Sequence, residues 1–597
     1  MTRKERLQFF LVWLALGVIP LFLRPLWQPD EGRYAEIPRE MLASGDWLTP
    51  RLNEVLYFEK PPFQYWLSAI SMKLFGESPF AARLPLALAS FLTMYAALRL
   101  ARRLGSDRPV WASFAAVTCL LLYACGQVLT LDPLFSSLCV FTLAAAVEAV
   151  SLRYHEKPPD FMEQTEQTDR GAKSATRKSV TGWTLAFFTG AGCALMTKGP
   201  VVIVLVGGAL LFSLYFAWND ARLRKAVMAT LFSPYGWLAF AAITVPWFVM
   251  VNIANPGHAR FFFYTEHFER FTTTKHSRQG SDNPILDKLF FVPIVLAGVV
   301  PWLIACITGA RRAVKFIAKS KGPRTPDAPL NRWTAAALLT AFAWPLLFFS
   351  ISGSKLIPYM MPCVVPLIAI AIAFEREDEG YIPFKRAGIE MIALGAAFLA
   401  AAMIVIFTPK TGVTPTRWVA DLQLTNGGWW TLFLGLGFSL IGVWGVRGAG
   451  LTAPRWMAWH IAMLITLTIA AQQVSGPLRV IDHLIAQAPK EKTLWISHGD
   501  YFQILPFLTK GRVTVVNATG ELNYGKERLS LAEQERWFSE GPLALTETGR
   551  RLRDEYPDRP VWALSDRRAW QKLPPESQAA WEVVDVSPKA CLLRFID

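Results

Sequence analysis

Thirteen apolar segments, each about 20 residues long, occupy most of the first 474 residues of the chain. A helix of that length spans the hydrocarbon core of a bilayer, and closely spaced segments of this kind have no counterpart in soluble domains. Charged residues make up only 18% of the 597 residues, against about 25% in soluble domains. The sequence therefore predicts a polytopic α-helical membrane protein. The predicted spans are residues 8–26, 79–99, 110–128, 131–151, 181–197, 199–217, 236–254, 289–308, 333–351, 357–375, 387–407, 429–446 and 456–474.

The links between these spans predict the orientation of the chain. If the N terminus is cytoplasmic, every inside link carries lysine or arginine, as the positive-inside rule requires. The lysine and arginine residues behind the net charge of +15 then set the orientation of the chain in the membrane, and no nucleic-acid partner is expected. Loops 27–78 and 255–288 and the C terminus fall outside, while the polar inside link 152–180 reads as a mobile insertion. The first segment, preceded by Arg3, Lys4 and Arg6, is expected to stay as a signal anchor.

The character of the chain changes after residue 474. Short β-rich runs at 493–496, 512–516, 560–564 and 581–584 alternate with helical patterns at 531–538 and 543–556. We therefore divide the chain into a transmembrane domain, residues 1–474, and a small α/β domain with a mostly parallel sheet, residues 475–597. This second domain carries no recognisable catalytic motif, which favours a role as a lid or stabilising cap.

Acidic and basic residues gather in the first outside loop. The run Asp30-Glu31-Gly32-Arg33-Tyr34 follows the first span directly, and Glu59-Lys60-Pro61-Pro62 lies further along the same loop. A charge at the edge of a span is costly unless it is paired or functional, so this loop is the primary candidate site. The pattern from Glu31 to Ala43 predicts an amphipathic helix that lies flat on the outer face and covers a cavity.

Three further positions carry ionisable groups near the outer face. Asp132 either caps the fourth predicted span, since Pro133 follows it, or belongs to the site. Lys198 and Lys355 either snorkel to the interface or join Arg33 and Lys60 in a cationic pocket suited to a phosphate. Both lysines have a glycine nearby, which lets a ligand approach the backbone.

The loop 255–288 contains the pair Glu266-His267. A lone histidine is most often structural, but this one faces the same compartment as Glu59 in the predicted topology. A divalent ion bridging Glu59 and His267 is therefore a hypothesis that sequence spacing alone does not establish.

Five motifs together resemble the bacterial branch of the GT-C membrane glycosyltransferases, and within it the aminoarabinose transferases that modify lipid A, related to protein O-mannosyltransferases. The motifs are Pro29 to Met41, Gly45-Asp46-Trp47, Phe58 to Pro62, Thr197-Lys198-Gly199-Pro200 and Ser354 to Pro362. The resemblance covers the whole chain and implies a GT-C fold with about 13 transmembrane helices and a periplasmic C-terminal domain. It is not specific to one sugar.

The resemblance implies an inverting enzyme of the inner membrane that moves a sugar, 4-amino-4-deoxy-L-arabinose, from undecaprenyl phosphate to lipid A at the periplasmic face. No cofactor is needed for the chemistry, and a zinc ion near the carrier phosphate is implied. Position 32, where alanine is frequent in the family, is expected to tolerate glycine without consequence. The resemblance implies Asp30 and Asp132 as catalytic acids, Arg33, Lys60 and Lys198 as residues near the phosphate, and Glu59 and His267 as metal ligands. To these we add Glu31 as a catalytic candidate, and Tyr34, Tyr57, Lys355 and Tyr359 as candidate substrate or phosphate ligands.

Two alternatives remain open on the sequence alone. The acceptor is either a lipid A phosphate, which is already anionic, or a hydroxyl of another glycan or a protein, for which Asp30 would serve as general base. A transporter of lipid-linked sugars would share the spans, but it would carry charges near the membrane midplane and internal repeats, and we find neither.

Overall fold

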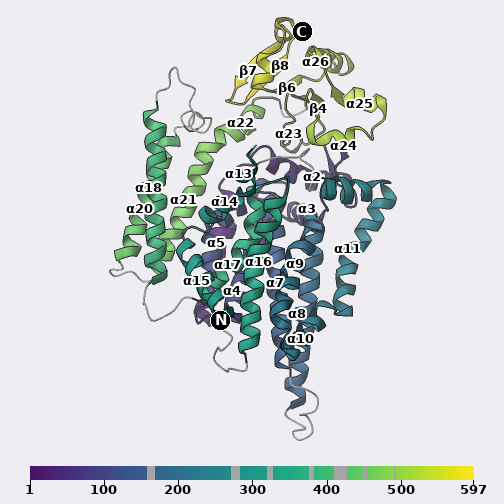
Figure 1. Ribbon diagram of the computed structural model, residues 1–597. Helices are drawn as coiled ribbons and strands as arrows, with labels where there is room; N and C mark the ends of the chain where they lie inside the picture. Colours follow the sequence, from purple (N-terminus) through teal and green to yellow (C-terminus); the bar gives the residue numbers. More distant parts are fainter. Residues whose placement is uncertain are drawn as a thin grey trace.

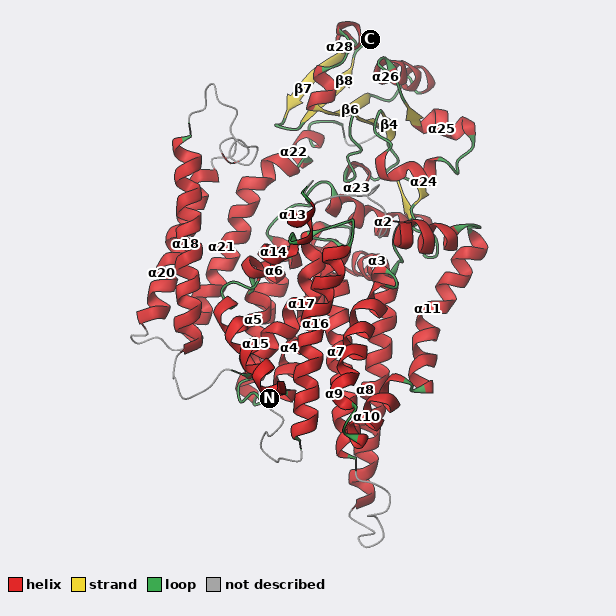
Figure 2. Ribbon diagram, viewed as in Figure 1, coloured by secondary structure: helices red, strands yellow, loops and turns green. Residues whose placement is uncertain are grey.

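The computed structural model describes residues 1–156, 169–269, 283–318, 327–374, 382–408, 422, 427–447, 453–489 and 492–597. Long helices stand side by side in one layer, and a smaller unit that contains a β-sheet lies across one end of them (Figures 1 and 2). The N terminus lies near the opposite end of the helical layer, and the C terminus lies in the sheet unit (Figure 1). The predicted polytopic helical fold with a C-terminal α/β unit is confirmed.

Nine helices of the described part are long and apolar enough to cross a membrane, and each coincides with a predicted span. They are Arg3–Phe22 (α1, Arg3–Trp13, with η1, Leu14–Val18, and η2, Ile19–Phe22), α4 (Pro79–Arg103), α7 (Leu131–His155), Lys178–Lys198 in α8 (Asp169–Lys198), Ala221–Ala254 (α10, Ala221–Leu231, and α11, Pro234–Ala254), α16 (Ala328–Ile351), Lys385–Phe407 in α18 (Ile382–Phe407), α20 (Gly427–Arg447) and Arg455–Gly476 in α21 (Ala453–Arg479).

The other four predicted spans are helical but short or broken. Two are the shorter apolar helices Ile203–Ala217 (η4, Ile203–Gly207, and α9, Gly208–Ala217) and Ile357–Ala373 (η6, Ile357–Met360, and α17, Met361–Ala373). One is the pair α14 (Phe291–Gly298) and α15 (Leu303–Ala318), bent by 107°. The last is split into α5 (Val110–Thr118) and α6 (Leu120–Gly126).

The two broken spans support one another. Cys119 adopts an extended conformation between α5 and α6, and the backbone N–H of Leu120 then donates to the carbonyl of Val300, in the bend between α14 and α15, at 3.0 Å. Irregular backbone at membrane depth is tolerated only where protein surrounds it, and this pairing satisfies that condition. Apolar periodicity alone does not reveal such breaks.

The first outside loop forms α2 (Asp30–Ser44), a two-stranded hairpin of β1 (Arg51–Leu52) and β2 (Val55–Leu56), and α3 (Phe63–Phe75). The helix predicted over 31–43 is present and ends at Gly45, whose φ of +72° suits glycine. The expectation of an interfacial amphipathic helix was wrong, because every residue from Glu31 to Met41 is buried. The C-terminal domain covers the face that would otherwise meet solvent (Figure 1).

The C-terminal domain holds a six-stranded sheet in the order β5-β4-β3-β6-β8-β7. The first four strands in this order are parallel, and β8 runs antiparallel to both neighbours. The predicted mostly parallel sheet is thus confirmed, while β5 and β8 were missed. The strands are β3 (Leu494–His498), β4 (Thr514–Val516), β5 (Phe538–Ser539), β6 (Val561–Asp566), β7 (Trp581–Val586) and β8 (Ala590–Phe595); the helices are α22 (Asp482–Ile485), α23 (Leu505–Thr509), η8 (Gly520–Leu522), α24 (Asn523–Lys526), α25 (Leu531–Trp537), α26 (Ala544–Glu555), α27 (Arg567–Gln571) and α28 (Pro575–Ala579).

Helix α2 and the C-terminal domain share one hydrophobic core. Ile37 and Met41 of α2 belong to the same buried cluster as Leu505 and Phe507 of α23. The closest approach is at Gly32, where a Cβ atom would lie 2.5 Å from the backbone N of Ile504. Such a contact is too short for any side chain, and backbone does not yield easily. Glycine at position 32 is therefore required in this chain, in agreement with the expectation that glycine is harmless at this position.

We expect Gly32→Ala to lower the free energy of unfolding by about 1–3 kcal/mol, because the added methyl group pushes the C-terminal domain away from α2. Thermal unfolding in detergent and the rate of proteolysis within residues 475–597 measure the effect. Gly182→Ala is the matched control, since a Cβ at that position in helix α8 meets nothing within 4 Å. Equal behaviour of the two variants would show that the close approach at Gly32 does not hold the domain.

Candidate functional site

A cavity of about 250 Å³ lies where α2, the start of α7, the end of α8 and the end of α16 meet beneath the C-terminal domain. Its lining combines ionisable and apolar side chains, a combination that suits an amphiphile with a charged head. The polar lining is Arg33, Tyr34, Glu59, Lys60, Asp132, Lys198, Glu266, His267, Ser352, Ser354 and Tyr359; the apolar lining is Leu131, Pro200, Val201, Val204, Phe348, Phe349 and Leu356.

Most of the residues singled out in the sequence meet in this cavity although they come from distant parts of the chain. Those that line it are Arg33, Tyr34, Glu59, Lys60, Asp132, Lys198, His267 and Tyr359. Four others, Asp30, Glu31, Tyr57 and Lys355, are not part of the lining. Each of these four has other partners in the structure.

Asp132 and Lys198 form an ion pair across the cavity. Helix α7 begins at Leu131 with Thr130 before it, so Asp132 is the second helical residue and not the N-cap. Lys198 is the last residue of α8, and its ammonium group lies 4.3 Å from the centroid of the Tyr359 ring. The lysine therefore points inward to the cavity, where an aromatic face and a carboxylate both stabilise its charge. It does not snorkel.

Lys60 and Glu266 form a second ion pair. The Lys60 Nζ donates to the carboxylate of Glu266 at 3.1 Å and to the backbone carbonyl of Glu59 at 2.6 Å. Both side chains are largely buried, with 14% and 8% exposed. Glu266 lies in η5 (Arg260–Glu269), so this pair joins the first outside loop to the loop before α14.

His267 follows Glu266 in η5 and lines the cavity. Both ring nitrogens face backbone carbonyls, since Nδ1 lies 2.7 Å from that of Phe262 and Nε2 lies 3.4 Å from that of Lys198. The shorter contact favours the tautomer with the proton on Nδ1. Burial and the nearby Lys60 ammonium lower the pKa of His267, which keeps the ring neutral at neutral pH. A neutral imidazole and the Glu59 carboxylate, which line the same cavity, are both ligand types of zinc, but among the described residues no third histidine, cysteine or carboxylate joins them in a metal-binding group.

Asp30 lies at the edge of the site rather than in its wall. Arg33 donates to Asp30 at 2.7 Å and also pairs with Glu521 of the C-terminal domain. The guanidinium packs against the rings of Tyr34 and Tyr57, 4.8 and 5.9 Å from their centroids. Tyr57 thus contacts Arg33 without lining the cavity. The Asp30 side chain is 50% exposed, so a substrate can reach it without a rearrangement.

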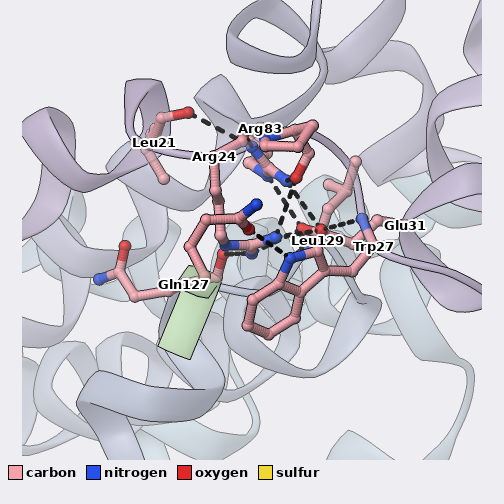
Figure 3. A network of polar contacts seen from close by, with 9 residues as sticks. Leu21, Arg24, Trp27, Glu31, Arg83, Gln127 and Leu129 are labelled. Carbon is pink, nitrogen blue, oxygen red and sulfur yellow. Dashed lines mark hydrogen bonds and ion pairs between the residues drawn. The ribbon is translucent and has the colours of Figure 1, made fainter. Parts of the chain in front are cut away.

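Glu31 is not part of the cavity lining and lies in a buried polar network (Figure 3). Its carboxylate accepts hydrogen bonds from Arg83 Nη2 at 2.7 Å, Arg24 Nη2 at 2.9 Å, and the backbone N–H groups of Trp27 and Leu129 at 2.8 Å each. Burial alone would raise the pKa of Glu31, but the two guanidinium groups hold it well below the usual range. The residue is a permanent anion that ties the segment before Asp30 to the segment before Asp132.

Lys355 is buried behind the cavity wall. Its ammonium donates to Asp287, which lies in α13 (Pro284–Lys288), at 2.8 Å and to the carbonyl of Ser352 at 2.5 Å. Its neighbours Ser354 and Leu356 line the cavity, so Lys355 fixes the loop that forms this wall.

Sequence reasoning missed Glu521 as a partner in the site. It is 488 residues from Arg33 in a domain without a catalytic motif, and nothing in its local sequence marks it. Arg24 and Arg83 were missed for a related reason, because isolated arginines at span ends resemble orientation signals.

The chain is similar to known proteins over most of its length. A sequence model of the dolichyl-phosphate-mannose-protein mannosyltransferase family matches residues 4–262. An undecaprenyl phosphate-alpha-4-amino-4-deoxy-L-arabinose arabinosyl transferase of Erwinia tasmaniensis is 29% identical over 566 residues, covering 89% of this chain and 91% of that protein. One from Proteus mirabilis is 32% identical over 459 residues, covering 75% and 72%.

The fold also resembles that of a solved structure. The crystal structure of ArnT from Cupriavidus metallidurans bound to undecaprenyl phosphate matches with a TM-score of 0.73 at 24% sequence identity, covering 100% of this chain and 99% of that one. The likeness therefore includes both the helical layer and the C-terminal domain.

Proposed function

Because the chain belongs to the family of undecaprenyl phosphate-alpha-4-amino-4-deoxy-L-arabinose arabinosyl transferases, we propose that it moves this aminosugar from undecaprenyl phosphate to lipid A. The observation that supports this best is the cavity itself. Lys60, Lys198 and Arg33 bring positive charge to one part of the wall, and Val201, Val204 and Phe348 supply an apolar part for the isoprenoid chain.

The proposed reaction is a displacement with inversion at the anomeric carbon. An oxygen of a lipid A phosphate attacks that carbon, a new carbon–oxygen bond forms, and the bond to the carrier phosphate breaks with its electron pair. Undecaprenyl phosphate leaves with one more negative charge than it had as a diester. Lys60 and Lys198 stabilise that charge where it develops, which is the usual source of rate enhancement in such transfers.

Asp30 and Asp132 have separate roles in this proposal. An acceptor phosphate is already anionic at neutral pH, so no strong general base is needed. Asp30, half exposed at the edge of the site, receives the protonated amino group of the sugar and orients the donor. Asp132 holds the Lys198 ammonium toward the leaving phosphate. If the acceptor were a hydroxyl, Asp30 would have to take its proton instead.

A zinc ion is proposed at Glu59 and His267, near the carrier phosphate. When bound, it would neutralise phosphate charge as a Lewis acid. We expect purified protein to contain about one zinc ion per chain, because a carboxylate and a neutral imidazole, both usual zinc ligands, line one cavity. Metal analysis of wild type and of Glu59→Gln measures this occupancy. Zinc-free protein whose activity is unaffected by a chelator would remove the metal from the proposal.

The protein is an integral inner-membrane protein, and we propose that its N terminus is cytoplasmic and its C-terminal domain periplasmic. The basic links of the chain fall on the N-terminal side of the membrane in this orientation. The termini at opposite ends of the molecule support an odd number of crossings (Figure 1). Lipid A then reaches the cavity from the periplasmic side of the bilayer.

A reconstituted reaction tests the proposed function. The full-length protein in lipid vesicles receives undecaprenyl-phosphate aminoarabinose and lipid A, and mass spectrometry follows lipid A. We expect the mass of one aminoarabinose to be added. Transfer only to another glycan or to a protein would overturn the acceptor assignment, and movement of the intact donor across the vesicle membrane would indicate a transporter.

A further inference from the structure

The cations of the cavity are held by carboxylates before any substrate binds. Lys198 pairs with Asp132, Arg33 with Asp30 and Glu521, and Lys60 with Glu266. The mechanism above has uses for Asp30 and Asp132. It has none for Glu266, although this carboxylate is 8% exposed and lies within hydrogen-bonding distance of a phosphate-binding lysine.

We propose that Glu266 is a positioning residue that occupies the place of the carrier phosphate at Lys60 and is displaced when the donor binds. This inference rests on the proposed function, since it takes Lys60 as a phosphate ligand. A carboxylate is planar and a phosphate is tetrahedral, but both present oxygen acceptors that an ammonium group binds in the same way. Two anions against one buried lysine repel each other, so the phosphate and Glu266 compete for it.

The contacts of Lys60 favour a change of its anionic partner over a movement of Lys60 itself. The backbone carbonyl of Glu59 fixes the ammonium at 2.6 Å, and the paired prolines that follow restrict the backbone. Lys60 therefore stays in place when its carboxylate partner leaves. Glu266 instead lies in η5, a π-helical segment, and its side chain can leave Lys60 by rotation about its own bonds.

The exchange has two consequences for the reaction cycle. In the ligand-free enzyme Glu266 neutralises the Lys60 ammonium, so Lys60 is not left as an unpaired buried cation before the donor arrives. After transfer, Glu266 competes with the product phosphate for Lys60 and so favours release of undecaprenyl phosphate. The competition therefore lowers the affinity for the carrier and raises the rate of product release.

Removing the charge of Glu266 is therefore expected to tighten binding, which is the opposite of what a structural defect would do. We expect the Kd for undecaprenyl phosphate to fall about tenfold in Glu266→Gln. The neutral alcohol undecaprenol should bind wild type and variant equally, because it does not compete for the lysine. Glu266→Ser removes the same charge and is measured in parallel, so that misfolding of one variant leaves the comparison intact.

A double-mutant cycle with Lys60→Met assigns the effect to this pair. Equilibrium binding is measured on the full-length protein in detergent, and the gain from Glu266→Gln should disappear when Lys60 is methionine. Unchanged or weaker binding by both Glu266 variants, or a gain that persists without Lys60, would overturn the inference. Wild type that fails to prefer undecaprenyl phosphate over undecaprenol would instead overturn the proposed function.

Discussion

Transfer of the aminosugar is expected to fall by about a thousandfold in Asp30→Asn, because the amino group of the donor loses the carboxylate that orients it, while the protein still folds and binds undecaprenyl phosphate. The exchange removes one negative charge and leaves the size of the side chain unchanged. Arg33 keeps its second carboxylate partner, Glu521, so the guanidinium stays in position. The loss should therefore appear in kcat and not in the Kd for the carrier, which makes single-turnover kinetics the appropriate measurement.

Glu521→Gln is the matched control for this prediction, because it neutralises the other carboxylate on the same guanidinium. If Asp30 acts on the substrate, Asp30→Asn should lose far more activity than Glu521→Gln. Equal losses would mean that Asp30 serves only to hold Arg33. Normal turnover by Asp30→Asn would remove the residue from the mechanism altogether.

Glu31→Ala is expected to lower the free energy of unfolding by about 3–5 kcal/mol, the largest effect on stability in the chain that we anticipate. The variant leaves the guanidinium groups of Arg24 and Arg83 buried without their shared anion, and it deprives two backbone N–H groups of their acceptor. Unfolding in detergent, followed by circular dichroism, measures the loss.

Glu540→Ala serves as the control for an exposed ion pair. Glu540 pairs with Lys526 on the surface of the C-terminal domain, and such pairs contribute about 0–1 kcal/mol. A loss in Glu31→Ala no larger than in Glu540→Ala would mean that water replaces the carboxylate in the network of Figure 3. Activity of the surviving folded fraction then reports whether Asp30 and Asp132 keep their relative positions.

The sequence predicted the helical part well wherever hydrophobicity and length decide the structure. Spans such as α4 and α7 need only about 20 apolar residues between basic links, and both conditions are visible in the chain. The break between α5 and α6 was not visible, because it depends on the carbonyl of Val300, far away in sequence. Short edge strands such as β5, with two residues, carry too little pattern to identify.

The residues of the site could be predicted where they carry a charge at a position at which charge is costly. Lys198 and Asp132 lie at span ends where charge is costly, and this anomaly predicted their convergence. Glu31 is as anomalous by the same criterion, yet its partners are buried arginines and it stabilises the fold. Composition does not separate these two uses of a buried acid. Only the direction of the side chain does, and the turn of α2 sends Asp30 and Glu31 to different sides.

The carboxylate already paired with Lys60 also decides which ligands the resting enzyme does not bind. A soluble anion, such as inorganic phosphate in the surrounding water, would have to displace the Glu266 carboxylate from Lys60, and only its own charge would favour that exchange. A carrier with a long hydrocarbon tail also gains binding free energy when that tail contacts the apolar lining of the cavity. This additional free energy drives the displacement of Glu266. Discrimination against free phosphate therefore needs no steric filter at the entrance.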